Sequence, residues 1–438
     1  MQWLSRLIGT EPEPVYQFGH TFNGEVNPKE FELFTAASKA FEEGKIIDAY
    51  KFFLNSLQNY TAGKPNPNII LDIHHDTLDF RLVQGSAVVV GKVNDKKIEA
   101  YADIVLKTGL HVAIKRRLLE RNYNFTYSSF YFHDDKVRIK IDLDNTTMTP
   151  QKIFFPIREI ALNADFEKEF IASEFPESTL LDTDVLIPID DDIKKKKYDF
   201  MRQWITECEA SIKRLPSNDN TGMISFTYLE LLLKIDYLIV PHKQIAQKIT
   251  ERLTEYYGDD STLVENKNAH LQTYIHTLND MPYKNFASQL YDTLITFDPM
   301  EKASDEEVVN FIEESLSKVR WYKRNRYPHV IPTIYNYMAF YLLYNYGLRP
   351  CIHRLLHLFV EINHSDYFKA LGYTPLYSTQ KEQLETRRIK SRINEVIRPH
   401  RSKYKQLKPF GEKLTYSSLN EFNHGFLLQI KHLDFTEL

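Results

Sequence analysis

The sequence predicts an α+β N-terminal module, with a mainly antiparallel sheet and packed helices, followed by an all-α helical region. Three observations predict it: period-2 apolar alternation between about residues 69 and 142, hairpin-length connections between those segments, and helical periodicity after Asp192. Hairpin-length connections join antiparallel neighbours. We therefore expect an N-terminal arm over 1–27, an α/β module over 28–178, a linker over 179–192 and an all-helical domain over 193–438.

The module begins with helices and continues with strands. Pro28 opens an apolar-periodic helix that Gly44 ends, and a second helix covers about 46–60. Strand-like alternation follows near 69–73, 78–82, 87–90 and 98–104, before a helix over 109–122. Two further strands over 126–132 and 136–142 and a helix over about 150–174 complete the expected elements.

The strand over 136–142 has the clearest alternation in the chain. Three apolar residues that face inward alternate with three cations that face outward, namely Val137, Ile139 and Ile141 with Lys136, Arg138 and Lys140. We expect this strand at an edge of the sheet, where its backbone groups can accept a strand of another polypeptide.

Every periodic segment beyond Asp192 has helical spacing. The segments lie near 193–214, 225–240, 242–257, 262–279, 283–296, 304–322, 330–346, 350–363, 378–398 and 415–431. Pro and Gly residues separate them. Their spacing favours helical hairpins, and a repeat solenoid stays open as an alternative because no fixed period with matching residues is present.

Composition excludes several classes of protein. Of 438 residues, 43% are hydrophobic and 26% charged, which is typical of a globular protein, and the net charge of −4 argues against electrostatic nucleic-acid binding by the whole chain. The two cysteines, Cys208 and Cys351, form no CxxC pair. There is no signal-peptide pattern and no apolar run of about 18–20 residues, so we expect a cytoplasmic protein without a membrane segment.

Three stretches characterise the order of elements between about residues 45 and 175. They are Gly85-Ser86-Ala87-Val88-Val89-Val90-Gly91 in the strands, Arg116-Arg117-Leu118-Leu119-Glu120-Arg121-Asn122 ending a helix, and Arg158-Glu159-Ile160-Ala161-Leu162-Asn163-Ala164-Asp165 in the last helix. In this order the stretch resembles the YbjN and type III secretion chaperone-like family. The resemblance implies a module that binds other polypeptides without catalysis, often as a homodimer. Two departures are the four strands expected before the central helix, one more than the small chaperones have, and the long helical region that follows.

One helix carries residues that are chemically able to hold zinc. His353, His357 and Glu361 recur every four residues, and His364 follows. Arg354 occupies the position where an HExxH motif has its glutamate, so the general base of that motif is missing. We therefore expect no bound metal, no cofactor and a solvated polar face, with a metal-dependent enzyme as the third functional hypothesis.

Positive charge is concentrated late in the chain. Residues 320–413 hold 18 Lys and Arg against 6 Asp and Glu, whereas residues 181–319 hold 15 against 25. Within the basic segment, 320–327 mixes cations with aromatic residues, which fits either a helix C-terminus or nucleic-acid stacking. The candidate anion-binding residues are Arg387, Arg388, Lys390, Arg392, Arg401, Lys403 and Lys405.

Two shorter clusters have simple structural interpretations. We expect His74-His75-Asp76 to form a polar turn at a strand end, and Asp190-Asp191-Asp192 to start a helix. No P-loop, Rossmann glycine pattern or GxSxG motif occurs. The favoured hypothesis is thus a non-enzymatic protein-interaction factor, adaptor or chaperone-like, for an unidentified polypeptide, and the second is a nucleic-acid-associated protein that uses residues 320–413.

Overall fold

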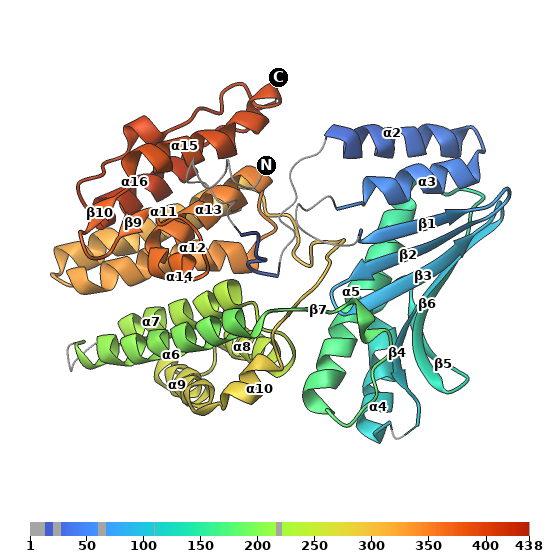
Figure 1. Cartoon of the computed structure of the whole chain (residues 1–438), viewed down its shortest axis with the longest axis horizontal. Helices are drawn as coiled ribbons and strands as arrows, with labels where there is room; N and C mark the ends of the chain where they lie inside the picture. Colours follow the sequence, from blue (N-terminus) through green and yellow to red (C-terminus); the bar gives the residue numbers. More distant parts are fainter. Residues whose placement is uncertain (1–13, 21–27, 60–66, 109, 216–220, 438) are drawn as a thin grey trace, which may run out of the picture.

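A computed structural model describes residues 14–20, 28–59, 67–108, 110–215 and 221–437. The chain forms two parts that lie side by side, an N-terminal module built on one large sheet and a larger helical region (Figure 1). The predicted fold class, α+β followed by all-α, is confirmed. Within the described residues, no helix is long and apolar enough to cross a membrane.

Six strands form the sheet, and every neighbouring pair is antiparallel. The order is β1-β2-β3-β4-β6-β5, with β1 (Ile69–Ile73), β2 (Leu78–Gln84), β3 (Ala87–Val93), β4 (Lys97–Leu106), β5 (Ser129–His133) and β6 (Lys136–Asp144). The alternation predicted for 136–142 is confirmed, because Val137, Ile139 and Ile141 are buried.

The prediction that 136–142 is an edge strand was wrong. β6 lies between β4 and β5, and the edge strands are β1 and β5. The physical reason is that β6 pairs with β4 along almost its whole length on one side and with its hairpin partner β5 on the other. Period-2 alternation identifies which face of a strand is buried, but it carries no information about the strand's two neighbours.

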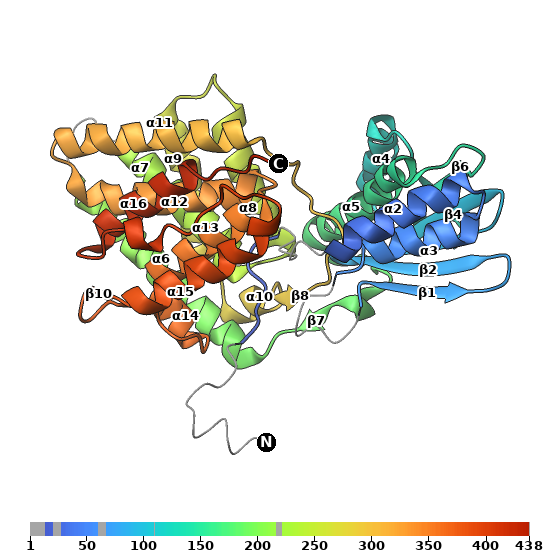
Figure 2. The same ribbon diagram turned by 90° about the horizontal axis from the view of Figure 1, so that it is seen from above.

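The helices of the module cover only one face of the sheet (Figures 1 and 2). They are α2 (Pro28–Glu42), α3 (Ile46–Ser56), α4 (Val112–Arg121) and α5 (Pro150–Glu174), and the 3₁₀ turn η1 (Asn122–Asn124) follows α4. Thr149 caps α5 by accepting a hydrogen bond from the Lys152 backbone N–H, and apolar residues at helical spacing, from Ile153 to Ala164, are buried beneath it. We call the opposite, helix-free side of the sheet the open face.

The segment predicted as a linker is held against the sheet by backbone hydrogen bonds. The Leu106 N–H donates to the Thr179 carbonyl (3.0 Å), and the Leu181 N–H donates to the Ile104 carbonyl (3.1 Å). The 3₁₀ turn η2 (Thr183–Val185) follows, and its Val185 packs on Val83 and Val88 at one end of the open face. Strand β7 (Ile187–Pro188) then pairs with β8 (Tyr291–Asp292) of the helical region.

The helical region has one continuous hydrophobic core. Its longer helices are α6 (Asp191–Lys213), α7 (Thr221–Lys234), α8 (Lys243–Gly258), α9 (Val264–Asp280), α11 (Asp305–Arg324), α12 (Ile331–Asn345), α13 (Pro350–Asn363), α15 (Thr386–Ile397) and α16 (Leu419–Lys431). Shorter elements are the π-helical turn η3 (Ile235–Ile239), α10 (Tyr283–Ala287), η4 (Pro328–Val330), α14 (Ser365–Ala370), β9 (Tyr377–Ser378), β10 (Gln383–Leu384), η5 (Arg398–Ser402) and η6 (Gly411–Lys413).

A segment of the helical region completes the core of the module. Phe297 is buried in the module's apolar cluster and meets Phe154 of α5 edge to face. The Gln84 side-chain oxygen accepts hydrogen bonds from the Thr296 N–H (3.0 Å) and the Phe297 N–H (2.8 Å). The module therefore depends on residues more than 100 positions beyond its predicted end at 178.

Part of the predicted N-terminal arm packs on the helical region. Phe18 is buried among aromatic rings that include His357 (5.1 Å) and Phe368 (5.0 Å), and the Gly19 N–H donates to the Tyr237 carbonyl (2.8 Å). Gly19 has φ +67°, and a Cβ there would lie 2.9 Å from the Tyr237 ring, so both its conformation and its surroundings favour glycine. The rest of the predicted arm, 1–13 and 21–27, lies outside the described residues.

Candidate functional site

The pairing register places charged side chains in a row across the open face. Asp72, Asp79, Lys92, Glu99 and Asp142 are successive partners on β1, β2, β3, β4 and β6. Neighbouring strands lie about 4.8 Å apart, so the row is about 19 Å long. We call the four carboxylates of this row the acidic row.

Each carboxylate of the acidic row has a lysine or histidine within 4.0 Å. Lys97 Nζ lies 2.5 Å from a Glu99 oxygen and 3.7 Å from an Asp142 oxygen, while Lys92 Nζ reaches Asp79 only at 4.0 Å. At the other end, His74 Nε2 lies 3.6 Å from Asp72 and 3.8 Å from Asp79. Because like charges directly opposite each other destabilise a sheet, the row is not explained by the stability of the fold.

A second row beside the acidic row contains two aliphatic residues, one tyrosine and two cations. It consists of paired residues on the same five strands, namely Ile70, Arg81, Val90, Tyr101 and Lys140. Both rows line a hollow of about 590 Å³ in the open face. Its volume lies within the range of ligand sites, about 300–1,000 Å³.

The aromatic side of the hollow is held rigidly. Arg138 stacks on the Tyr101 ring (4.2 Å to its centre) and donates from Nε to the Asp103 carboxylate. Lys136 Nζ lies 3.0 Å from the same carboxylate, and the Lys140 ammonium lies 5.0 Å from the centre of the Tyr131 ring. The tyrosines are therefore fixed in place before any ligand arrives.

The prediction that His353, His357 and Glu361 lie on a solvated polar face was wrong. His353 and Glu361 are buried and His357 is half-buried, because α15 and Phe18 of the N-terminal segment cover this side of α13. His357 Nδ1 lies 2.9 Å from the Tyr237 hydroxyl, and burial lowers the pKa of His353 to about 4 and that of His357 to about 3.

The carboxylate of the predicted trio has its own cation. Arg392 donates from Nη1 (3.3 Å) and Nη2 (2.8 Å) to the two oxygens of Glu361. Throughout the part of the chain that the structure describes, no group of three or more His, Cys, Asp or Glu residues has an arrangement that could hold a metal ion. This side of α13 lies in the packed interior of the helical region. The residues that a metal-dependent enzyme would use already contact other side chains there.

The structure divides the seven candidate anion-binding residues into two sets. Three are ion-paired: Arg392 with Glu361, Lys390 with Glu412 (2.5 Å) and Lys403 with Glu437 (3.0 Å). The other four are exposed and form no ion pair with any described residue, namely Arg387, Arg388, Arg401 and Lys405. The continuous strip predicted from the sequence is therefore interrupted.

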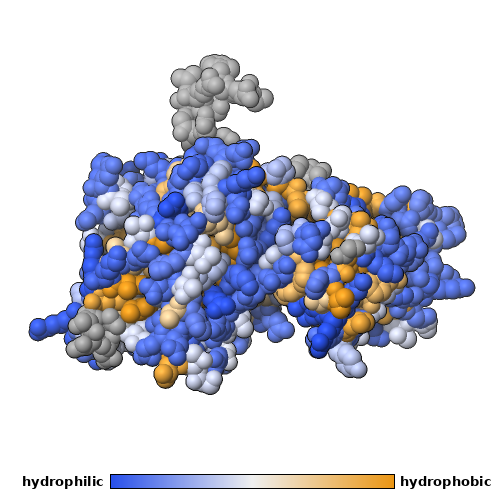
Figure 3. All heavy atoms as spheres, turned by 90° about the horizontal axis from the view of Figure 1, so that it is seen from below, coloured by the Kyte–Doolittle hydropathy of each residue, from blue (hydrophilic) through white to orange (hydrophobic). Residues whose placement is uncertain are grey.

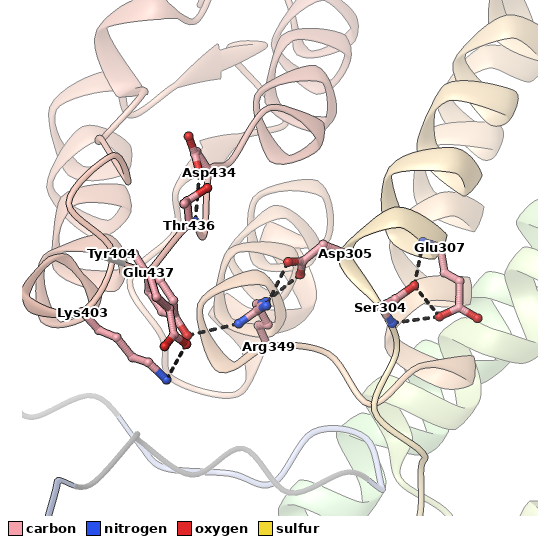
Figure 4. A network of polar contacts seen from close by, with 9 residues as sticks. All are labelled: Ser304, Asp305, Glu307, Arg349, Lys403, Tyr404, Asp434, Thr436 and Glu437. Carbon is pink, nitrogen blue, oxygen red and sulfur yellow. Dashed lines mark hydrogen bonds and ion pairs between the residues drawn. The ribbon is translucent and has the colours of Figure 1, made fainter.

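Figure 4 shows the setting of one paired cation. Near Lys403, Arg349 forms two hydrogen bonds to Asp305 (2.6 and 2.8 Å) and a third to the Tyr404 hydroxyl (3.1 Å). This network joins the starts of α11 and α13 to the C-terminal segment. Lys403 belongs to it through Glu437, so its role is structural.

The remaining sequence clusters lie where their simple interpretations place them. Arg320 to Arg324 form the end of α11, with Trp321 53% exposed, and Asp191 and Asp192 form the first turn of α6 without a side-chain cap from Asp190. His75 is exposed in the turn after β1 and pairs with Asp76 (2.6 Å). His74 differs, because it contacts the acidic row, a role that the sequence analysis missed.

Apolar side chains also reach the surface of the module. Figure 3 shows apolar surface among hydrophilic surface on the side where α4 lies. Exposed apolar residues of α4 and α5 include Val112, Leu119 and Phe166, whereas Ile114 and Leu118 of α4 pack inward. The predicted homodimer is compatible with this surface and stays a prediction.

No protein-family model matches the chain, and no curated protein is significantly similar to it. A function is therefore inferred from the chemistry of the open face and of the charged surfaces.

Proposed function

We propose that this protein is a non-enzymatic, adaptor or chaperone-like factor that holds an extended basic segment of another polypeptide on the open face of its sheet. The observation that carries the proposal is the acidic row, which lies beside the apolar and aromatic side chains of Ile70, Val90 and Tyr101. A row of about 19 Å matches about six residues of extended chain at 3.3 Å each. Lysine and arginine fit both rows, since their charged ends reach carboxylates while their alkyl stems pack on apolar surface.

The lining of the hollow lacks the residues of a serine or cysteine nucleophile. It contains carboxylates, cations, tyrosines and aliphatic residues, with no cysteine, serine or histidine among them. The Ser–His and Cys–His pairs of covalent catalysis are therefore absent from this lining. The resemblance of this module to polypeptide-binding chaperones points in the same direction.

The open face is also suited to a long ligand. The hollow spans all six strands, from Ile70 on β1 to Tyr131 on β5, and its floor is the sheet itself. A rigid, pre-formed surface reduces the ordering cost of binding an extended chain. The far end of the face is closed by Val185, so a bound segment would lie across the charged half.

The test compares two charge-removing double variants of the full chain. Glu99→Gln with Asp142→Asn removes half of the acidic row, and Glu314→Gln with Asp260→Asn removes two exposed carboxylates of the helical region. The probe is a labelled peptide of alternating Lys and Val residues, followed by fluorescence anisotropy. We expect the first variant to weaken binding at least about tenfold, which corresponds to about 1.4 kcal/mol, and the control to bind like the unaltered protein.

Equal binding by the unaltered protein and the acidic-row variant would contradict the proposal. The same pair of proteins, used to capture partners from the native cell, identifies the natural ligand as a polypeptide that the unaltered protein retains and the acidic-row variant releases. Thermal unfolding of both variants checks that neither substitution disturbs the fold.

A further inference from the structure

One side of α15 presents cations without apolar residues. Its buried side carries Ile389, Ile393, Val396 and Ile397. Its opposite side carries exposed residues at positions 387, 391, 394 and 398, spaced by four, three and four residues, so they share one stripe of the helix. Arginine occupies both ends of this stripe, as Arg387 and Arg398.

Further exposed cations extend the stripe at both ends. Arg388 lies beside Arg387, and Arg401 follows in η5 one turn after Arg398. Lys405 and Lys408 continue beyond it. We call Arg387, Arg388, Arg398, Arg401, Lys405 and Lys408 the basic stripe; none of the six forms an ion pair with a described residue, in contrast to Lys390, Arg392 and Lys403.

Acidic residues near the stripe are few. Glu395 is exposed on α15 and accepts a hydrogen bond from Ser391 (2.7 Å), and Glu385 precedes the helix. Two carboxylates against six cations leave a strongly positive surface. Figure 1 shows α15 at the periphery of the helical region, where such a surface is accessible to a large ligand.

The composition of the stripe selects among anionic partners. Four of its six cations are arginines, whose forked guanidinium groups match phosphate oxygens. Among the described residues beyond Trp321, no large apolar side chain is exposed, so neither an apolar anchor for an acidic peptide nor a ring for stacking unpaired bases is present near α15.

The length of α15 fits the spacing of two phosphate backbones. Arg387 and Arg398 lie eleven positions apart, which is about 16 Å along a helix, and the major groove of B-DNA is about 12 Å wide. We propose that the basic stripe binds the phosphate backbone of double-stranded nucleic acid, with α15 lying across a groove and no sequence preference. This site is independent of the polypeptide-binding function proposed for the open face.

The proposal implies a specific dependence on salt. About four phosphate contacts give a slope of roughly −4 for log K against log salt concentration, or about a 100-fold loss of affinity between about 50 and 200 mM salt. Binding of this kind has a Kd of about 10⁻⁴ to 10⁻⁶ M at physiological salt. No base contact is involved, so random and defined sequences should bind equally.

The experiment measures binding of the full chain to a labelled random-sequence duplex by fluorescence anisotropy at several salt concentrations. The test variant is Arg387→Ala with Arg388→Ala and Arg398→Ala, all exposed positions. The control is Lys115→Ala with Arg116→Ala, a half-buried and an exposed cation on α4. We expect the triple variant to lose at least about tenfold in affinity and to flatten the salt slope by about 2 to 3, with the control unchanged.

Three results would overturn the proposal. They are no binding of the duplex by the unaltered protein at about 50 mM salt, equal binding by the triple variant, or tighter binding of a single strand than of a duplex. The last measurement is the binding of a poly-glutamate peptide that carries the same charge as the duplex. If it binds as tightly as the duplex, the stripe recognises acidic polypeptides instead.

Discussion

The N-terminal module and the helical region bury ionisable side chains in two different ways. In the module, Glu167 on α5 is fully buried and meets two cations, Arg117 (2.9 Å) and Arg121 (2.9 Å). In the helical region, His353 on α13 is buried and His357 is half-buried, and burial lowers their pKa values, so they stay neutral. Glu167 is therefore held by charge pairing and these two histidines by staying neutral, although Glu361 on the same helix is paired with Arg392.

This difference has a consequence for the response of each part to pH. A buried histidine that is neutral in the fold binds a proton readily once the chain unfolds, so acid favours unfolding. The module contains the opposite case, a half-buried carboxyl group whose protonated form is favoured in the fold. Asp165 on α5 has its pKa raised to about 7, mainly by burial and further by the nearby Glu169 carboxylate.

The largest expected effect is acid unfolding of the helical region. His353, His357 and His364 all have pKa values below the usual 6.5, so their contribution to stability is lost as the pH falls below 6.5. Each costs about 1.4 kcal/mol per pH unit, so His353 and His357, with pKa values of about 4 and about 3, together cost roughly 5 kcal/mol at pH 4.5, and His364 acts in the same direction. Since proteins are stable by only about 5–15 kcal/mol, the helical region should unfold near this pH.

Tryptophan fluorescence measures this transition selectively. Trp204 is buried in the helical region beside His364 (6.2 Å between rings), and no tryptophan occurs between residues 28 and 178. As a matched variant, His353→Leu should lower the number of protons taken up on unfolding by about one. A helical region that resists urea equally at pH 7 and pH 4.5 would show that these histidines are not held neutral by burial.

The second prediction concerns Asp165 of the module, whose contribution to stability has the opposite dependence on pH. The raised pKa of Asp165 means that its contribution to stability is complete below about pH 4 and is lost as the pH rises through about 7. Asp165→Asn keeps an oxygen that can accept the hydrogen bonds of the Ser86 backbone N–H (2.7 Å) and hydroxyl (2.8 Å). The variant should therefore gain roughly 3 kcal/mol more stability at pH 8 than at pH 5.

Limited proteolysis across a urea gradient, read on fragments of the module, measures this difference. The control is Asp192→Asn, which removes an exposed carboxylate at the start of α6 and should show the same small effect at both pH values. If Asp165→Asn changes stability equally at pH 5 and pH 8, then Asp165 is ionised in the fold throughout, and the contrast between the two parts disappears.

The sequence predicted the fold class and the faces of its elements, but not their neighbours. Alternation correctly showed that Val137, Ile139 and Ile141 face inward, yet it placed β6 at an edge because register is a property of strand pairs. Helical spacing likewise grouped His353, His357 and Glu361 on one side of α13. It could not show that Phe18 and Arg392, which are distant in sequence, would cover that side.

The candidate site shows the same limit. Every residue of the acidic row was predicted to lie in or beside a strand, but the row exists only through four pairwise registers. The partners that divide the basic segment, Glu361, Glu412 and Glu437, also come from other elements. Charge counts along the chain detected the excess of cations, and only the three-dimensional structure separates the paired ones from the exposed ones.

The smallest expected effect is a change in the free energy of unfolding. It distinguishes the carboxylates of the acidic row from the buried carboxylate of Glu167. Asp72 and Asp142 end the acidic row, and each lies directly opposite another carboxylate. Opposed like charges destabilise a sheet by roughly 0.2–1 kcal/mol, so Asp72→Asn or Asp142→Asn should leave the free energy of unfolding unchanged or raise it by about 0.5 kcal/mol. Glu167→Gln should instead lower it by about 3 kcal/mol, because two arginines lose their buried partner.

Urea unfolding of the three variants, combined with binding of the alternating Lys and Val peptide, tests both parts of the argument. A carboxylate that is kept for binding can be removed without loss of stability but with loss of affinity, whereas a carboxylate that holds the fold together shows the reverse. If Asp72→Asn and Asp142→Asn destabilise the module as much as Glu167→Gln does, the acidic row is a structural network. The carboxylates of the open face would then serve the fold, and the proposed binding of a basic polypeptide would lose its physical basis.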